Sequence, residues 1–128
     1  MKILIVDDCS TTRKLLGLYL KSRGYEVVYA ENGLDAMEKL GRESVNLVMT
    51  DLNMPFMDGL ELTRSLKSDP GLRHIPVLMV TTEADEEEKA TALEAGASGY
   101  LVKPVSADEI SSNIKHILSE IFKAKEVI

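Results

Sequence analysis

The chain has 128 residues, of which 45% are hydrophobic and 28% charged, and this size and balance fit one globular domain with its own core. The net charge of −6 argues against direct contact with nucleic acid, because phosphate binding needs a basic face. One cysteine cannot form an internal disulfide, and neither a signal peptide nor a run near the roughly 20 apolar residues of a membrane span is present. We therefore expect a cytoplasmic protein with no membrane partner.

Strand-like and helix-like segments alternate along the chain. Short apolar runs rich in β-branched residues predict buried strands, and apolar residues that repeat every three or four positions predict helices. Ser10 is a good N-cap for the first helix, and Gly24 closes that helix. In chain order we predict strand 3–6, helix 11–23, strand 25–29, helix 33–40, strand 45–50, helix 60–68, strand 75–80, helix 85–95, strand 98–102 and helix 107–122. Residues 123–128 are predicted to form a frayed tail.

This alternation favours one fold class. Five strands separated by five helices predict an α/β domain with a parallel sheet and helices on both faces. Right-handed crossovers leave few possible strand orders, and in each of them ligands bind beyond the carboxyl ends of the strands. Functional residues are therefore expected in the loops that follow the strands.

Polar and charged residues stand at four of these strand ends. Asp7 and Asp8 follow the first predicted strand, and Asp51 follows the third. Thr81 follows the fourth strand and Lys103 the fifth. If these strands are neighbours, three carboxylates, a hydroxyl and an ammonium meet in one shallow pocket. Close carboxylates repel one another and need a cation, and oxygen ligands without histidine or cysteine favour Mg²⁺.

Each of these residues also has an ordinary explanation. An aspartate after a strand is often a turn former, a threonine commonly ends a strand, and a lysine before a proline is commonly solvated. Their joint occurrence at four strand ends is what favours a functional site. By contrast, Cys9 is expected to be a small buried residue, and His74 and His116 are expected to be surface residues.

The motifs at the strand ends resemble a known family. Four segments carry the resemblance, namely "VDD" at 6–8, "TDLNMP" with "MDG" at 50–59, "MVTTEA" at 79–84 and "AGASGYLVKP" at 95–104. They are similar to the receiver domain of bacterial response regulators, in particular the stand-alone chemotaxis regulators of the CheY type. The resemblance implies a receiver domain at 1–122 with a tail at 123–128. It also implies a flavodoxin-like, doubly wound, five-stranded sheet in the order 2-1-3-4-5.

The same resemblance assigns roles at the predicted metal site. It implies that Asp51 accepts a phosphoryl group, and that Asp8 and Asp51 bind Mg²⁺ directly while Asp7 acts through water. The backbone carbonyl of Asn53 is implied as a further metal ligand.

Further roles follow from the resemblance for residues around this site. Thr81 corresponds to the switch hydroxyl, Lys103 to the lysine that binds the phosphoryl group, and Tyr100 to an aromatic that turns from exposed to buried on phosphorylation. The Lys103–Pro104 bond is expected to be cis. Three residues are expected to tune hydrolysis of the phosphorylated form: Asn53, Thr82 and Glu83.

The function implied is a phosphorylation-switched signalling module rather than an enzyme acting on a separate substrate. A sensor histidine kinase would supply the phosphoryl group, and a monomer would present a changed surface, roughly 85–95 and 98–117, to an output protein such as a flagellar motor switch protein. A phosphatase is a further possible partner. A phosphorelay intermediate or a phosphate sink would use the same site without that output.

Two readings of other classes compete with this one. A phosphatase with an aspartyl-phosphate intermediate usually has a second acid two residues after the nucleophile, but Asn53 stands there and cannot transfer a proton. A nucleotide- or flavin-binding domain needs a glycine-rich turn after a strand, and "DDCSTTR" has none.

Overall fold

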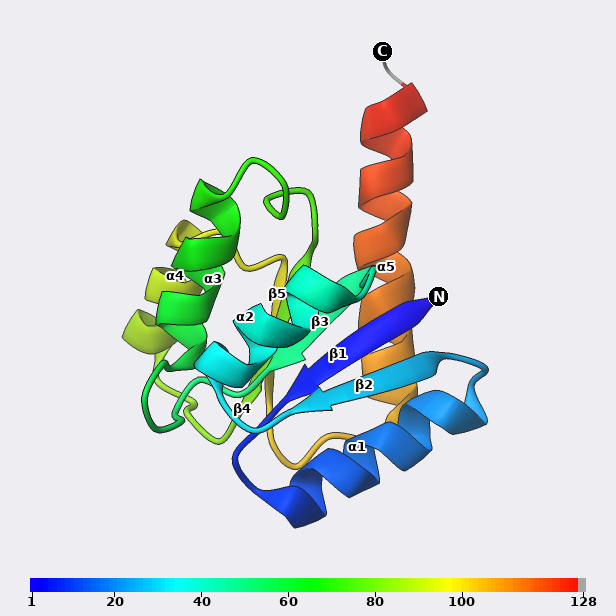
Figure 1. Ribbon diagram of the computed structural model, residues 1–128. Coiled ribbons are helices and arrows are strands. Elements are labelled where there is room, and N and C mark those ends of the chain that lie inside the picture. The colour runs from blue at the N-terminus through cyan, green and yellow to red at the C-terminus, as the bar shows by residue number, and fades with distance from the viewer. Residues whose placement is uncertain (127–128) are drawn as a thin grey trace.

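The computed structural model describes residues 1–126 and shows five strands alternating with five helices (Figure 1). The strands pair in the order β2-β1-β3-β4-β5, and every pair is parallel. This confirms the predicted flavodoxin-like, doubly wound α/β fold. The elements are β1 Lys2–Val6, α1 Ser10–Ser22, β2 Glu26–Ala30, α2 Gly33–Arg42, β3 Leu47–Thr50, α3 Gly59–Ser68, β4 Val77–Thr81, α4 Glu86–Glu94, β5 Gly99–Val102 and α5 Ala107–Glu126.

Alternate residues of each central strand pack into separate cores. Ile3 and Ile5 of β1 face α1 and α5, whereas Leu4 and Val6 face α2 and α3. A third cluster places Met79 of β4 against α4. Side chains of successive strand residues point to opposite faces of a sheet, so an unbroken apolar run is needed when both faces are covered.

The ends of several elements differ from the prediction. Cys9, not Ser10, occupies the N-cap position of α1, and no side-chain hydrogen bond caps that helix. Strands β3 and β4 begin two residues later than predicted, because backbone hydrogen bonding rather than hydrophobicity defines a strand. Helix α5 continues to Glu126, so most of the predicted tail is helical, and 127–128 lie outside the described residues.

No helix among residues 1–126 is both long and apolar enough to cross a bilayer. Helix α5 has 20 residues, but charged residues such as Asp108, Glu109 and Lys115 recur along it.

Candidate functional site

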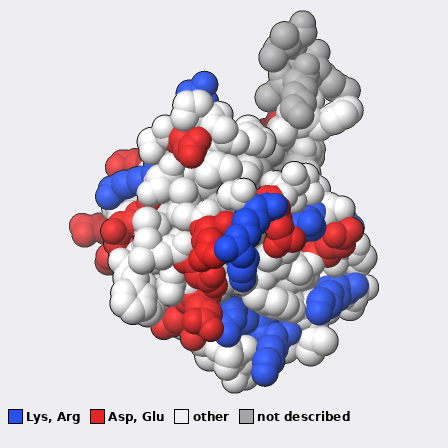
Figure 2. All heavy atoms as spheres, viewed as in Figure 1, with Lys and Arg blue, Asp and Glu red and all other residues white. Residues whose placement is uncertain are grey.

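The loops that follow the strands gather at the lower edge of the sheet in Figure 1. In a parallel sheet all the carboxyl ends lie at the same edge, so residues far apart in the chain meet there. Figure 2 shows acidic side chains collected toward the lower left of the same view, near these loops, and along the left side near α4.

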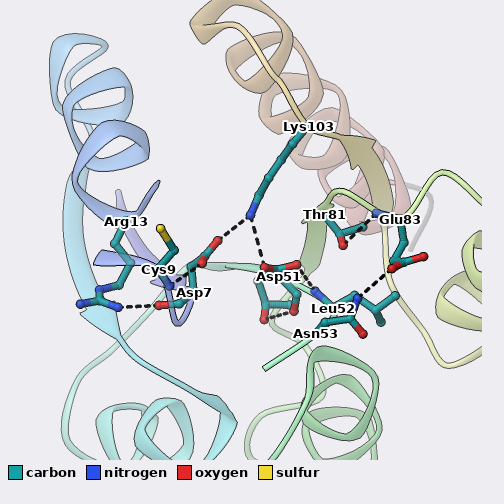
Figure 3. Close-up of polar contacts among 10 residues, drawn as sticks. Asp7, Cys9, Arg13, Asp51, Leu52, Asn53, Thr81, Glu83 and Lys103 are labelled. Atoms are coloured by element: carbon teal, nitrogen blue, oxygen red, sulfur yellow. Dashed lines mark hydrogen bonds and ion pairs between the residues drawn. The ribbon is translucent and has the colours of Figure 1, made fainter. Parts of the chain in front are cut away.

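Asp51 lies at the centre of this edge, directly after β3. Its backbone N–H donates to the carbonyl of Val6 on β1 (2.9 Å), which joins the two central strands at their ends. One carboxylate oxygen, Oδ1, accepts from the backbone N–H of Leu52 (2.7 Å), and the other, Oδ2, faces Lys103 Nζ at 3.3 Å (Figure 3). The carboxylate is therefore held from two sides while its side chain keeps 13% of its surface exposed.

Asp7 and Asp8 follow β1 and lie beside Asp51. The side chain of Asp7 is only 2% exposed, and its carboxylate accepts from the backbone N–H of Cys9 (2.9 Å) and from Lys103 Nζ (2.8 Å). Asp8 is exposed. Each of the three aspartates offers one carboxylate oxygen, and these atoms all lie within 4.8 Å of one another.

This donor set suits a hard divalent cation. Carboxylate oxygens are the ligands that Mg²⁺ prefers, and one buried, one exposed and one intermediate carboxylate leave a side open to water. The structure thus brings together the three carboxylates that the sequence predicted. The Lys103 ammonium also reduces their mutual repulsion, because it bridges two of them.

Lys103 is charged in this position. Burial of its ammonium disfavours the charged form, but the hydrogen bond to Asp7 and the charges of Asp51 and Asp7 outweigh that cost and raise the pKa of Lys103. The Lys103–Pro104 peptide bond is cis, as expected.

A second group of polar residues lies on the β4 side of Asp51. Thr81 is fully buried, and its hydroxyl accepts from the backbone N–H of Glu83 (3.3 Å). The Glu83 carboxylate accepts from the Asn53 side-chain amide (3.2 Å), which links the loops after β3 and β4. The Glu83 carbonyl accepts from the Tyr100 hydroxyl (2.8 Å). Thr82 is exposed.

Tyr100 is partly buried rather than exposed. It packs against the cluster that contains Met79 and Ala92, and burial raises the pKa of its phenol, with the charges of Glu88 and Glu83 adding to the effect. The structure therefore shows the inward position, which the resemblance associated with the phosphorylated form.

Some contributors were missed or misjudged from the sequence. Cys9 is exposed instead of buried, and a hydrogen bond with the Thr12 side chain lowers the pKa of its thiol. Arg13 donates to the carbonyl of Asp7 (2.6 Å), and no sequence signal indicated this contact. Gly59 begins α3 so close to Asp51 that a Cβ would stand 2.1 Å from the Asp51 carbonyl oxygen. The "MDG" motif includes that glycine, but the sequence did not indicate that its backbone packs so closely against Asp51.

Fold and site together define a doubly wound α/β domain with an acidic pocket at the carboxyl edge of its sheet. Residues 3–115 match the family model described as "Response regulator receiver domain", and the chain belongs to this family.

Relatives and solved structures agree with this assignment. The chain is 41% identical to chemotaxis protein CheY1 of Helicobacter pylori over 120 residues, covering 92% of this chain and 97% of that protein. It is also 41% identical to chemotaxis protein CheY-3 of Vibrio cholerae over 124 residues, covering 96% and 92%. The receiver domain of a signal transduction histidine kinase from Syntrophus aciditrophicus superposes with a TM-score of 0.86 at 36% identity, covering 94% of this chain and 91% of that one.

Proposed function

We propose that this chain is a response regulator that accepts a phosphoryl group on Asp51 from a histidine kinase, in a reaction that needs Mg²⁺. The observation that carries the proposal is the placement of Asp51 beside Lys103 and the two other aspartates at the carboxyl edge of the sheet. The similarity to chemotaxis proteins CheY1 and CheY-3 supports a role in control of the flagellar motor.

The side chains at this edge have complementary tasks in the transfer. Asp51 supplies the nucleophilic carboxylate oxygen, which forms a bond to phosphorus as the phosphorus–nitrogen bond of the donor phosphohistidine breaks and its electron pair returns to the imidazole. Asp8, Asp51 and the carbonyl of Asn53 would hold Mg²⁺, with Asp7 acting through water. The bound ion would neutralise the repulsion between the carboxylate and the phosphoryl oxygens.

Lys103 and Thr81 would bind the remaining phosphoryl oxygens. The Lys103 ammonium already contacts Asp51 Oδ2, so it lies where negative charge develops during transfer. Among the bonds of residues 1–126, the Thr81 hydroxyl acts as the acceptor from the Glu83 N–H, which leaves its own hydrogen for donation.

The same contacts would couple phosphorylation to a surface change. A phosphoryl group that draws the Thr81 hydroxyl toward Asp51 would move it away from the Glu83 N–H, and the Glu83 backbone could then settle where its carbonyl holds the Tyr100 hydroxyl inward. Phosphorylation would therefore bias the position of Tyr100 and the surface formed by α4, β5 and α5. We propose that an output protein, such as a flagellar motor switch protein, reads this surface on a monomeric regulator.

Slow hydrolytic loss of the phosphoryl group belongs to the same proposal. Asn53 and Glu83 are joined by a hydrogen bond beside Asp51, and exposed Thr82 lies between Thr81 and Glu83, so these residues would control access of water to the phosphorylated carboxylate. A separate phosphatase could act at this position. A relay intermediate or phosphate sink would share the transfer chemistry and lack only the output step.

A phosphorylation assay tests the proposal. Incubation with acetyl phosphate and Mg²⁺ should add one phosphoryl group, seen as a mass increase that base removes, and EDTA should prevent it. Asp51→Asn should abolish the product, whereas Asp108→Asn, which changes an exposed carboxylate at the start of α5, should not. Undiminished labelling of Asp51→Asn would refute the assignment of the acceptor.

A further inference from the structure

Arg13, near the start of α1, turns back toward the loop that carries the two aspartates after β1. Its guanidinium donates to the backbone carbonyl of Asp7 at 2.6 Å (Figure 3). The side chain is partly buried, and a hydrogen bond from a charged donor is roughly twice as strong as one between neutral groups. Because the contact is made to the backbone, Arg13 acts on the position of the loop.

The carbonyl that Arg13 holds belongs to the peptide bond between Asp7 and Asp8. A peptide unit is planar, so fixing its oxygen also fixes the direction in which the chain enters Asp8. On the other side, the N–H of Asp7 donates to the carbonyl of Ala30 on β2 (3.2 Å). The sheet therefore holds one peptide unit of Asp7, and Arg13 holds the next.

Asp8 is the member of the acidic group whose position depends most on the backbone. Its side chain is exposed, whereas the side chains of Asp7 and Asp51 are 2% and 13% exposed. An exposed carboxylate has few neighbours that could fix its direction. Its oxygen nevertheless lies within 4.8 Å of those of Asp7 and Asp51. Holding the peptide unit before Asp8 therefore keeps this carboxylate with the other two.

The start of α1 lacks the usual device for fixing such a loop. An N-cap side chain commonly binds a free N–H of the first helical turn and sets how the chain enters the helix. Cys9 occupies the N-cap position and its side chain makes no such bond. Instead, the Asp7 carboxylate accepts from the Cys9 N–H (2.9 Å), and Arg13 returns from the helix to the Asp7 carbonyl. The loop geometry depends on Arg13 for this reason.

Arg13 has two opposite effects on a cation bound to the three carboxylates. Its positive charge repels the cation, so removing the charge alone should tighten Mg²⁺ binding. Its hydrogen bond keeps the aspartates in place, so removing the bond should weaken Mg²⁺ binding. Groups that orient metal ligands without touching the metal commonly change the affinity by about 10–100-fold, whereas salt screens the repulsion from a partly exposed charge. The effect on geometry should therefore dominate.

We propose that Arg13 is a positioning residue for the metal site, which holds the peptide unit between Asp7 and Asp8 so that both carboxylates stay within reach of one cation. This inference rests on the proposed function, because it takes the acidic group as the Mg²⁺ site. Arg13 contributes to binding of the ion and not to transfer of the phosphoryl group. Its loss should change the Mg²⁺ concentration that transfer needs, but not the rate at saturating Mg²⁺.

Thermal unfolding at a series of MgCl₂ concentrations and fixed ionic strength gives the Mg²⁺ dissociation constant by linkage. Arg13→Met should raise this constant about tenfold, the lower end of the usual range because Arg13 acts through the backbone. Arg13→Lys keeps the charge and a donor but lacks the planar fork, so its constant should rise only about threefold. Lys14→Met removes the same charge from the adjacent exposed position and should change the constant less than about twofold.

Labelling with acetyl phosphate provides the second readout. In Arg13→Met the Mg²⁺ concentration that gives half the maximal rate should rise about tenfold, while the maximal rate stays within about twofold of the wild-type value. A purely structural role would lower the melting temperature without Mg²⁺ and leave both Mg²⁺ constants unchanged.

Three results would overturn the proposal while leaving the metal site in place. They are an unchanged Mg²⁺ constant in Arg13→Met, tighter binding in that variant, and binding by Arg13→Lys that is no tighter than binding by Arg13→Met. The buried residues of α1, Leu16, Gly17 and Leu20, remain in every variant, so each is expected to fold. Failure of Mg²⁺ to stabilise the wild-type chain would instead refute the metal site of the proposed function.

Discussion

Replacing Lys103 by methionine removes the cation that bridges Asp7 and Asp51 while retaining much of the side-chain volume. The Lys103 ammonium lies 2.8 Å from Asp7 and 3.3 Å from Asp51, and its side chain is 17% exposed. At an effective dielectric constant of 20, these distances correspond to attractions of about 6 and about 5 kcal/mol. Burial of the ammonium offsets a large part of that attraction.

The change in unfolding free energy caused by the substitution depends on the balance between this attraction and the burial of the ammonium. Removing one partner of a buried ion pair typically destabilises a protein by about 3–5 kcal/mol, because the other charge is left uncompensated. The site lies at the edge of the sheet and Asp51 reaches water. We therefore expect Lys103→Met to lower the unfolding free energy by about 3 kcal/mol without Mg²⁺. Mg²⁺ should then reduce the deficit, because it neutralises the same carboxylates.

The size of the Mg²⁺ effect can be worked out by linkage. With a dissociation constant of about 1 mM, 10 mM Mg²⁺ stabilises the wild-type chain by about 1.4 kcal/mol. Loss of the competing ammonium should tighten Mg²⁺ binding about tenfold, which raises the stabilisation of Lys103→Met to about 2.7 kcal/mol. The difference in unfolding free energy between the two proteins should therefore shrink by about 1.3 kcal/mol when Mg²⁺ is added.

Urea unfolding in EDTA and in 10 mM Mg²⁺ measures all four free energies. Lys2→Met is the matched control, because Lys2 Nζ lies 3.5 Å from Glu43 near the opposite edge of the sheet. That partly exposed pair should contribute less than about 1 kcal/mol, and its loss should leave the Mg²⁺ effect unchanged. Equal stabilisation of Lys103→Met and the wild-type chain by Mg²⁺ would refute the idea that the ammonium and the ion share these carboxylates.

Two further predictions concern output and alkaline pH. Phosphorylation should strengthen binding of a flagellar motor-switch peptide several-fold, and Tyr100→Ala should remove that gain; equal affinity with and without phosphorylation would show that the output model is wrong. The folded pKa values of Lys103 and Tyr100 are raised above the ordinary values of 10.5 and 10.0, so the folded chain holds these protons longer than the unfolded chain. Their contribution to stability should be complete below about pH 10 and be lost as pH rises through the folded pKa values. Urea unfolding between pH 8 and 11 should show this decline, with a smaller slope in Lys103→Met and Tyr100→Phe; stability that rises with pH would contradict it.

The sequence alone indicated the fold class and which polar residues would meet at the carboxyl edge of the sheet. Strands with both faces covered need unbroken apolar runs, so Ile3 to Val6 was recognisable without coordinates. Because parallel strands end at one edge, the residues after those runs could be placed together before their contacts were known. The strand order itself came from the family resemblance, since hydrophobic patterning does not distinguish among the remaining topologies.

Tertiary structure decided the contacts that join distant parts of the chain. Lys103 meets Asp7 across 96 positions, and only the pairing of the strands brings their side chains within hydrogen-bonding distance. Phe56, in the loop between β3 and α3, has a positive φ of 69° and lies within a local turn from Pro55 to Met57, and the Met57 carbonyl accepts from the N–H of Gly33, which lies in a distant part of the chain. A pattern of residue types predicts which side chains are available at an edge. The bonds each one makes depend on distances and backbone angles that the assembled sheet imposes.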